Sequence, residues 1–206
     1  MKRYGVIALI VLVLTGTGCV LLRTCWARMA TSIPAVGGKD LHIRLKDDGG
    51  TFLQRDERWA ADQLGPSNCT LGSHGCLVCS VAMACADLGV KLTPKELNAR
   101  LKEKNGFLPQ GWVVWNAMPA ATDGQVEAAY HRSPSHAVMD AALEDGRYPV
   151  VKFFLLGGVQ HWCVIVGKDG QDYLARDPLR DEKDPVPLST LTEKIYAVRV
   201  IGRAGE

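Results

Sequence analysis

The sequence predicts a mixed helix-and-strand domain of the α+β class, because it contains two kinds of segment. Residues 76–88 form a run of small and apolar side chains that stops before Gly89, as a buried helix does. Residues 149–156, 161–166 and 195–201 are rich in β-branched and aromatic side chains, which favour strands. We therefore expect a helix packed on an antiparallel sheet.

Residues 1–28 predict a membrane anchor or a signal segment. Lys2 and Arg3 precede an uncharged stretch, 4–22, and about 20 such residues are enough to cross a bilayer as a helix. The same stretch fits a cleaved signal peptide, and Cys19 after small residues fits a lipoprotein signal. Each of these predicts a protein that is membrane-anchored or secreted, with its domain outside the cytoplasm.

Residues 29–50 predict a linker and an edge strand. Pro34 and the pair Gly37-Gly38 are typical of a linker. Residues 41–45 then alternate between apolar and polar side chains, which indicates a half-exposed strand at a sheet edge.

Residues 51–206 are expected to form one domain. The run Thr93–Glu96 is a capping box with proline at the first helical position, so a helix should begin there. A further helix is predicted over 135–145, and the buried strand 149–156 should lead into His161.

Cys76 is the candidate nucleophile, because it stands at the expected start of the first helix. Unpaired N–H groups and the positive end of the helix dipole favour a thiolate there, and the thiolate is the attacking species. Cys79 and Cys85 fall in the middle of the same apolar helix, where they are expected to be small core side chains.

His161 and Asp177 are expected to be neighbours. The run 167–170, Gly-Lys-Asp-Gly, predicts a hairpin turn between strands 161–166 and 173–176, and folding about it places His161 opposite residues 176–178. A histidine that takes a proton from a thiol needs its other nitrogen held by an acceptor, and a carboxylate on the adjacent strand supplies one.

A longer set of residues in this order resembles the papain-like bacterial peptidases related to the bacteriocin-processing, double-glycine-leader type, the C39-like peptidases. The resemblance covers about residues 50–201. The residues that carry it are Gln54–Trp59, Leu64–Gly65, Thr70–Gly72, Gly75–Cys76, Ala82–Met83, Leu92–Asn98, Pro149–Val151, His161–Trp162 and Asp177–Pro178.

The resemblance implies a papain-like α+β fold in a bacterial protein, and together with the N-terminal segment this predicts a location in the bacterial cell envelope. It also implies a cysteine peptidase with Cys76 as nucleophile, His161 as general base and Asp177 as the residue that orients it. The glutamine that stabilises the oxyanion in this family lies six residues before the cysteine, where this chain has Thr70. Gln54 is therefore the oxyanion candidate, and Gln160 is a weaker one.

Three other functions use the same residues. A zinc site can be drawn from Cys76, Cys79, His161 and Cys163, but structural zinc ligands usually come from loops rather than from a helix and a strand. We therefore expect neither a metal nor a cofactor. A catalytically silent module that binds peptides in the same cleft and an acyl transferase that uses the same thiol both remain open.

The composition of the chain limits the classes of partner that we expect. With a formal net charge of +2 over 206 residues and no basic block, the chain does not look like a nucleic-acid-binding protein. The expected partners are a peptide or protein substrate, the membrane through the N-terminal segment, and a separate transporter, since there is no room for one here. Seven cysteines in an exported chain also predict disulfides, with Cys69 as a candidate and one thiol kept free.

Overall fold

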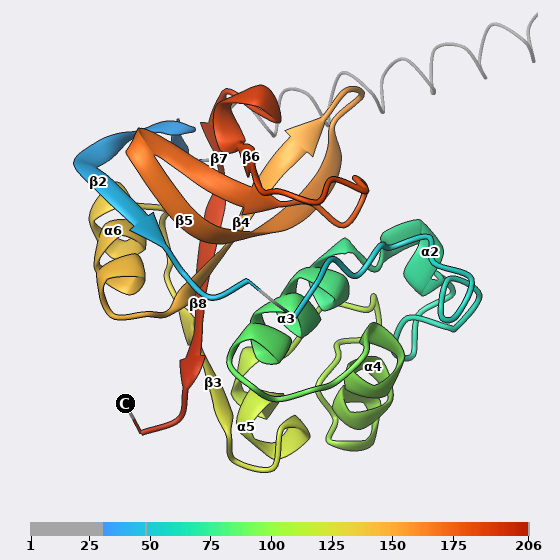
Figure 1. Ribbon diagram of the computed structural model, residues 1–206. Helices are drawn as coiled ribbons and strands as arrows, with labels where there is room; N and C mark the ends of the chain where they lie inside the picture. Colours follow the sequence, from blue (N-terminus) through green and yellow to red (C-terminus); the bar gives the residue numbers. More distant parts are fainter. Residues whose placement is uncertain (1–30, 48, 206) are drawn as a thin grey trace, which may run out of the picture.

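The computed structural model describes residues 31–47 and 49–205, and its centre is a six-stranded sheet (Figure 1). The strand order is β2-β5-β4-β8-β3, with β6 paired to β5 off this path, and every pairing is antiparallel. The strands are β1 (Ile33–Pro34), β2 (Val36–Arg44), β3 (Val126–Tyr130), β4 (Tyr148–Leu155), β5 (Val159–Arg176), β6 (Val186–Pro187), β7 (Lys194–Ile195) and β8 (Ala197–Arg203). Strands β1 and β7 form a separate two-stranded sheet.

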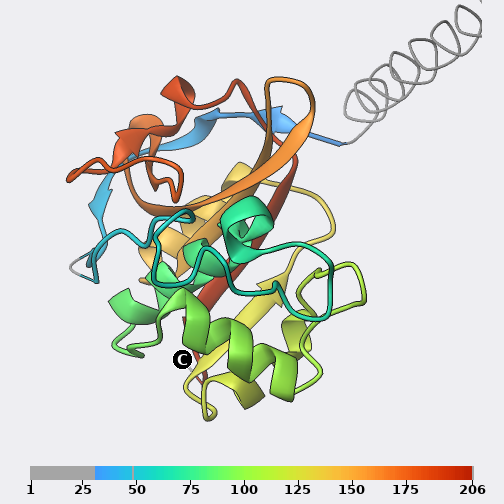
Figure 2. The ribbon, with the colours of Figure 1, turned by 90° about the vertical axis from the view of Figure 1, so that its right-hand side faces the viewer.

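Helices cover both faces of the main sheet (Figures 1 and 2). The helices are α2 (Leu71–His74), α3 (Cys76–Asp87), α4 (Pro94–Glu103), α5 (Met118–Ala121) and α6 (His136–Glu144), with 3₁₀ turns η1 (Trp115–Ala117) and η2 (Leu188–Thr190). Because neighbouring residues of a strand point to opposite faces, Val150 packs in the core that contains α3 and Val151 in the core that contains α6. The α+β class with an antiparallel sheet is confirmed.

The helix predicted at residue 76 is present as α3. It is buried nearly all round, which explains why its side chains are apolar and small. It ends where Gly89 adopts a φ of +86° and Val90 donates to the Cys85 carbonyl at 2.8 Å. The capping box of α4 is also present, since Thr93 and Glu96 each accept a hydrogen bond from the other's backbone N–H.

The prediction of a hairpin turn at residues 167–170 is wrong. These residues lie inside β5, an unbroken strand of 18 residues, and pair with 44–41 of β2. The backbone N–H and C=O groups of residues 167–170 therefore find hydrogen-bond partners in β2, whereas in an exposed turn many of them would bind water. Gly170 has a φ of +63°, and Gly167 approaches the Ile43 backbone more closely than a side chain would allow. In Figure 1, β5 curls strongly, and its two ends approach each other.

The predicted edge strand is present as β2, and it begins earlier than expected. Residues 36–38, predicted as part of a linker, belong to β2, and Ile33 pairs with Ile195 in β1. Long-range pairing with β5 and β7 holds this segment extended, in spite of its glycines.

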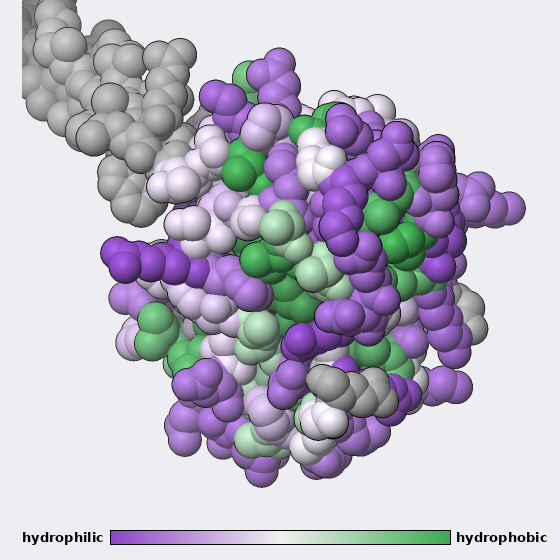
Figure 3. All heavy atoms as spheres, turned by 90° about the vertical axis from the view of Figure 1, so that its left-hand side faces the viewer, coloured by the Kyte–Doolittle hydropathy of each residue, from purple (hydrophilic) through white to green (hydrophobic). Residues whose placement is uncertain are grey.

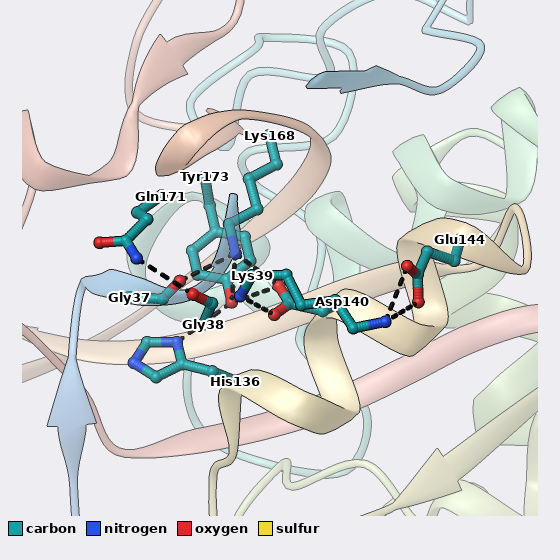
Figure 4. A network of polar contacts seen from close by, with 9 residues as sticks. All are labelled: Gly37, Gly38, Lys39, His136, Asp140, Glu144, Lys168, Gln171 and Tyr173. Atoms are coloured by element: carbon teal, nitrogen blue, oxygen red, sulfur yellow. Dashed lines mark hydrogen bonds and ion pairs between the residues drawn. The ribbon is translucent and has the colours of Figure 1, made fainter. Parts of the chain in front are cut away.

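A buried ion pair fastens β2 to the rest of the fold (Figure 4). Lys168 of β5 lies 2.6 Å from Asp140 of α6, and both side chains are almost fully buried. Lys168 also donates to the Gly37 carbonyl at 2.8 Å, and the Lys39 N–H donates to Asp140 at 2.8 Å. The Tyr173 hydroxyl completes the network by donating to Asp140 at 2.9 Å. Three elements therefore meet at one compensated pair of charges.

The surface of the domain is largely hydrophilic on the face seen in Figure 3, where hydrophilic residues surround a smaller central group of hydrophobic ones. Within residues 31–47 and 49–205, no helix has the length and apolar character needed to cross a bilayer; the anchor predicted over 1–28 lies outside these residues. The five described cysteines are all free, so the disulfide predicted for Cys69 is not formed with any of them.

Candidate active site

Cys76 is the first residue of α3, and Gly75 explains why the helix can begin there. The short helix α2 is capped by Thr70 and ends at Gly75, whose N–H donates to the Leu71 carbonyl at 2.7 Å. A side chain at Gly75 would collide with the Leu71 backbone. The chain therefore turns closely from α2 into α3, and Cys76 lies in a first turn, where unpaired N–H groups favour negative charge.

His161, near the start of β5, and Asp177, directly after its end, form a buried pair. His161 Nε2 donates to Asp177 Oδ1 at 2.6 Å, and both side chains are almost fully buried. The Leu179 N–H donates to the same carboxylate oxygen at 2.8 Å, which fixes its orientation. Phe153 of β4 packs its ring edge-to-face with the His161 ring, 5.2 Å between centroids. The proximity predicted for His161 and Asp177 is thus present, although a different backbone path produces it.

The pKa of His161 reflects both of its neighbours. Burial lowers this pKa, but hydrogen bonds to Asp177 and to Cys76, together with the negative charges of both, raise it to about 9. With Nε2 engaged by Asp177, Nδ1 is the nitrogen left to face the sulfur. The hydrogen bond joins His161 to Asp177, the effect of Cys76 on the same pKa indicates that the sulfur is near the ring, and the raised pKa favours a protonated imidazole at neutral pH.

The other buried thiols have a different environment. Burial raises the pKa of Cys79, raises that of Cys85 to about 12, and raises that of Cys163 well above its ordinary value. These cysteines are therefore held as neutral thiols and behave as core side chains.

Gln54 lies at the same site. Its side-chain amide donates to the Gly72 carbonyl at 2.9 Å, and its backbone N–H donates to the Pro178 carbonyl at 2.8 Å. It therefore bridges the segment that leads to Cys76 and the residue that follows Asp177. Gln160, by contrast, is exposed near the tip of the β4–β5 hairpin.

Sequence reasoning missed the residues that dock α3 on β5. Ser80, a polar residue in an otherwise apolar helix, donates its hydroxyl to the Trp162 carbonyl at 3.1 Å. Trp162 in turn packs against Trp115, 6.5 Å between ring centroids. The signal in the sequence that could have found this contact is Ser80 itself, a hydroxyl side chain within an apolar run. These contacts set the position of the helix that carries Cys76 relative to the strand that carries His161.

A hollow of about 260 Å³ lies beside Gln54 and Asp177. Its lining combines apolar and charged side chains: Leu53, Arg55, Asp56, Pro178, Leu179 and Asp181. Three of these six residues, Leu53, Arg55 and Pro178, are direct sequence neighbours of Gln54 or Asp177, so a bound chain segment there would lie next to the candidate site.

A zinc site finds no support in the described chain. No group of three or more histidine, cysteine, aspartate or glutamate side chains within 31–47 and 49–205 is arranged to hold a metal ion.

Comparisons with known proteins bear on the fold. No protein-family model matches the sequence, and no curated protein does. A solved structure from Bacillus anthracis, named a "putative C39-like peptidase", is similar to this structure with a TM-score of 0.50 and 16% sequence identity, over 81% of this chain and 100% of that chain. At this identity the likeness concerns the fold, which is therefore C39-like.

Proposed function

We propose that the protein is a papain-like cysteine peptidase that hydrolyses a peptide or isopeptide bond through an acyl-enzyme on Cys76. The observation that carries this proposal is the buried His161–Asp177 pair, joined at 2.6 Å, next to a cysteine in the first turn of a buried helix. A deeply buried imidazole with a raised pKa beside a thiol is an arrangement that activates sulfur.

The chemistry follows from the roles of the three groups. The Cys76 sulfur attacks the substrate carbonyl carbon, and His161 gives its proton to the nitrogen that leaves, so the amide bond breaks and a thioester forms. Water then attacks the thioester while His161 takes a proton from it, which releases the acid and restores the Cys76 thiolate beside the protonated His161. Asp177 holds the ring throughout and stabilises its charge. The Cys76 N–H and the Gln54 amide are the proposed oxyanion donors.

The cellular setting is proposed from the sequence. Residues 1–28 would tether the domain to the membrane or direct its secretion, which places it outside the cytoplasm of a bacterial cell. If the substrate is a double-glycine leader peptide, as in the bacteriocin-processing peptidases that the sequence resembles, a separate transporter would be the partner.

Thiol labelling of the full chain tests the nucleophile. With limiting iodoacetamide and intact-mass detection across pH, we expect one fast adduct at Cys76, lost in Cys76→Ala and slowed in His161→Ala. Cys69→Ala is the matched control, because Cys69 is a half-buried free thiol outside the site, and the fast adduct should persist in it. Slow labelling of several cysteines, unchanged by His161→Ala, would contradict the proposal.

A peptide digest tests the reaction. The full chain is incubated with a mixed peptide library, and cleaved products are identified by mass spectrometry, with Cys76→Ala as the blank. Adding glycinamide separates hydrolysis from transfer, because a transferase would append the amine to the new carboxyl end. Binding of peptides with no cleavage by the wild-type chain would leave a binding module as the function.

A further inference from the structure

Four strands place two cations and two aromatic rings on one face of the sheet. Lys152 of β4 pairs with Trp162 of β5 and with Ala197 of β8, while Arg199 of β8 pairs with Tyr130 of β3. Cross-strand partners, and residues two apart on one strand, share a face. The side chains of Trp162, Lys152, Arg199 and Tyr130 therefore lie on the same face, and with Trp115 of η1 we name them the cation patch.

The cation patch lies at the Cys76 end of α3. At the other end of this helix, Arg203 donates to the Leu88 carbonyl. Near its start, the Ser80 hydroxyl donates to the Trp162 carbonyl at 3.1 Å. Trp162 directly follows His161 in β5, so the backbone of the patch continues into the candidate active site, while the two side chains point to opposite faces of the strand.

Aromatic rings enclose the Arg199 guanidinium. Its central carbon is 3.9 Å from the centroid of the Tyr130 ring, 5.5 Å from that of Trp115 and 5.8 Å from that of Trp162. Its Nη1 donates to the His131 carbonyl at 3.2 Å and to the Val198 carbonyl at 2.7 Å, and these bonds hold the side chain in place. Such a fixed, planar group presents its remaining donors in one direction.

Neither cation of the patch has an acidic partner within the described residues. Arg199 and Lys152 are half-buried, yet no carboxylate of 31–47 or 49–205 forms an ion pair with either of them. Burial lowers the pKa of both groups, and the charge of Arg199 lowers that of Lys152 further. Two neighbouring like charges withdrawn from water are unfavourable, and an anion between them would offset this cost.

We propose that the cation patch binds the carboxylate side chain of an acidic residue in the peptide substrate, close to the bond that is cut. This inference rests on the proposed peptidase function. Because both hydrogens of Nη1 are engaged, the Nε and Nη2 side of the Arg199 guanidinium is the side left for a carboxylate, and Nε has no hydrogen-bond partner among the described residues. The Lys152 ammonium adds a second charge, and the rings of Trp115 and Trp162 cover the methylene groups of the same side chain.

Cleavage of paired peptides tests the proposal. The full chain is given two pools of acetylated, amidated octapeptides that differ by glutamate or glutamine at one fixed position, with that position moved along the peptide. We expect cleavage to favour glutamate at least tenfold at one position near the cut, equivalent to about 1.4 kcal/mol. Arg199→Gln and Lys152→Gln should each reduce this ratio, and Arg199→Lys should keep part of it.

Lys194→Gln is the matched control, because Lys194 is an exposed cation of neighbouring β7, and it should leave the ratio unchanged. Unfolding by urea is measured for each variant, and the charge-conserving Arg199→Lys decides the case if Arg199→Gln does not fold. Equal cleavage of the two pools, or an unchanged ratio in both Arg199→Gln and Lys152→Gln, overturns the proposal while the peptidase function stands.

A binding measurement separates the two proposals. The Cys76→Ala full chain is immobilised, and the peptides that it retains from each pool are counted by mass spectrometry. Retention of the glutamate pool that is lost in Cys76→Ala/Arg199→Gln supports the cation patch even if the wild-type chain cleaves nothing. Equal retention of both pools overturns it.

Discussion

Replacing Asp177 by asparagine should remove most of the contribution that protonation of His161 makes to the free energy of unfolding. Asparagine keeps the shape of the side chain and an acceptor oxygen for the ring, but it removes the negative charge that helps to raise the His161 pKa to about 9. In the unfolded chain this pKa returns to about 6.5. The difference of about 2.5 units corresponds to about 3 kcal/mol of folding free energy.

The sign of this contribution sets the pH range. A pKa raised by folding stabilises the folded chain fully below 6.5, and the gain is lost as pH rises through about 9. Asp177→Asn should therefore cost up to about 3 kcal/mol more at pH 6 than at pH 10. The free energy of unfolding is measured in urea at both pH values, and NMR follows the titration of the His161 ring.

A second histidine–aspartate pair provides the control. His42 and Asp169 lie 2.7 Å apart, but both are largely exposed, so solvent screens their charges. Asp169→Asn should then leave the free energy of unfolding almost unchanged at either pH. If the two variants behave alike, or if His161 titrates near 6.5 in the wild-type chain, the reasoning is refuted.

Three further substitutions test the scaffold through the free energy of unfolding in urea. Lys168→Met leaves Asp140 as a buried charge without its partner and should cost about 3–5 kcal/mol, most of it restored by adding Asp140→Leu; a stable single variant would contradict this. Thr93→Ala removes the cap of α4 and should cost about 1 kcal/mol, while Thr93→Ser should not, and equal losses in the two variants would argue against capping. Gly75→Ala pushes a methyl group into the Leu71 backbone and should cost about 1–3 kcal/mol, so a variant as stable as the wild type would show that the junction has room.

The candidate site could be predicted largely from local chemistry. Cys76 at a helix start follows from the glycine before it and the apolar run after it, and both signals lie within a few residues of the cysteine. The path that joins His161 to Asp177 could not be predicted in this way. The glycines at 167 and 170 favour a turn locally, but pairing with β2, more than a hundred residues earlier in the chain, decides the conformation.

The fold shows the same division. The helix α4 carries its own start signal at Thr93, so its existence was predictable without tertiary contacts. Strand β3 was not predicted, because Val126–Tyr130 contains two alanines and a glutamate and has little preference for strand. Its antiparallel register with β8 supplies what the side chains lack. The burial of Lys168 was equally hidden, since only the approach of Asp140 from α6 makes it tolerable.

The curl of β5 means that the candidate site consists of two structural parts, the His161–Asp177 pair on the sheet and Cys76 on the helix α3. The strand β5 carries the imidazole, and the carboxylate belongs to the residue directly after it, so this pair is completed by the folding of the sheet alone. The sulfur belongs to the helical layer and reaches the pair only while α3 stays seated on the sheet through contacts such as Ser80 with Trp162. A displacement of that layer by a fraction of a helical turn would disconnect the nucleophile and leave its base intact. Regulation of the candidate site would therefore act most simply at the interface between α3 and β5.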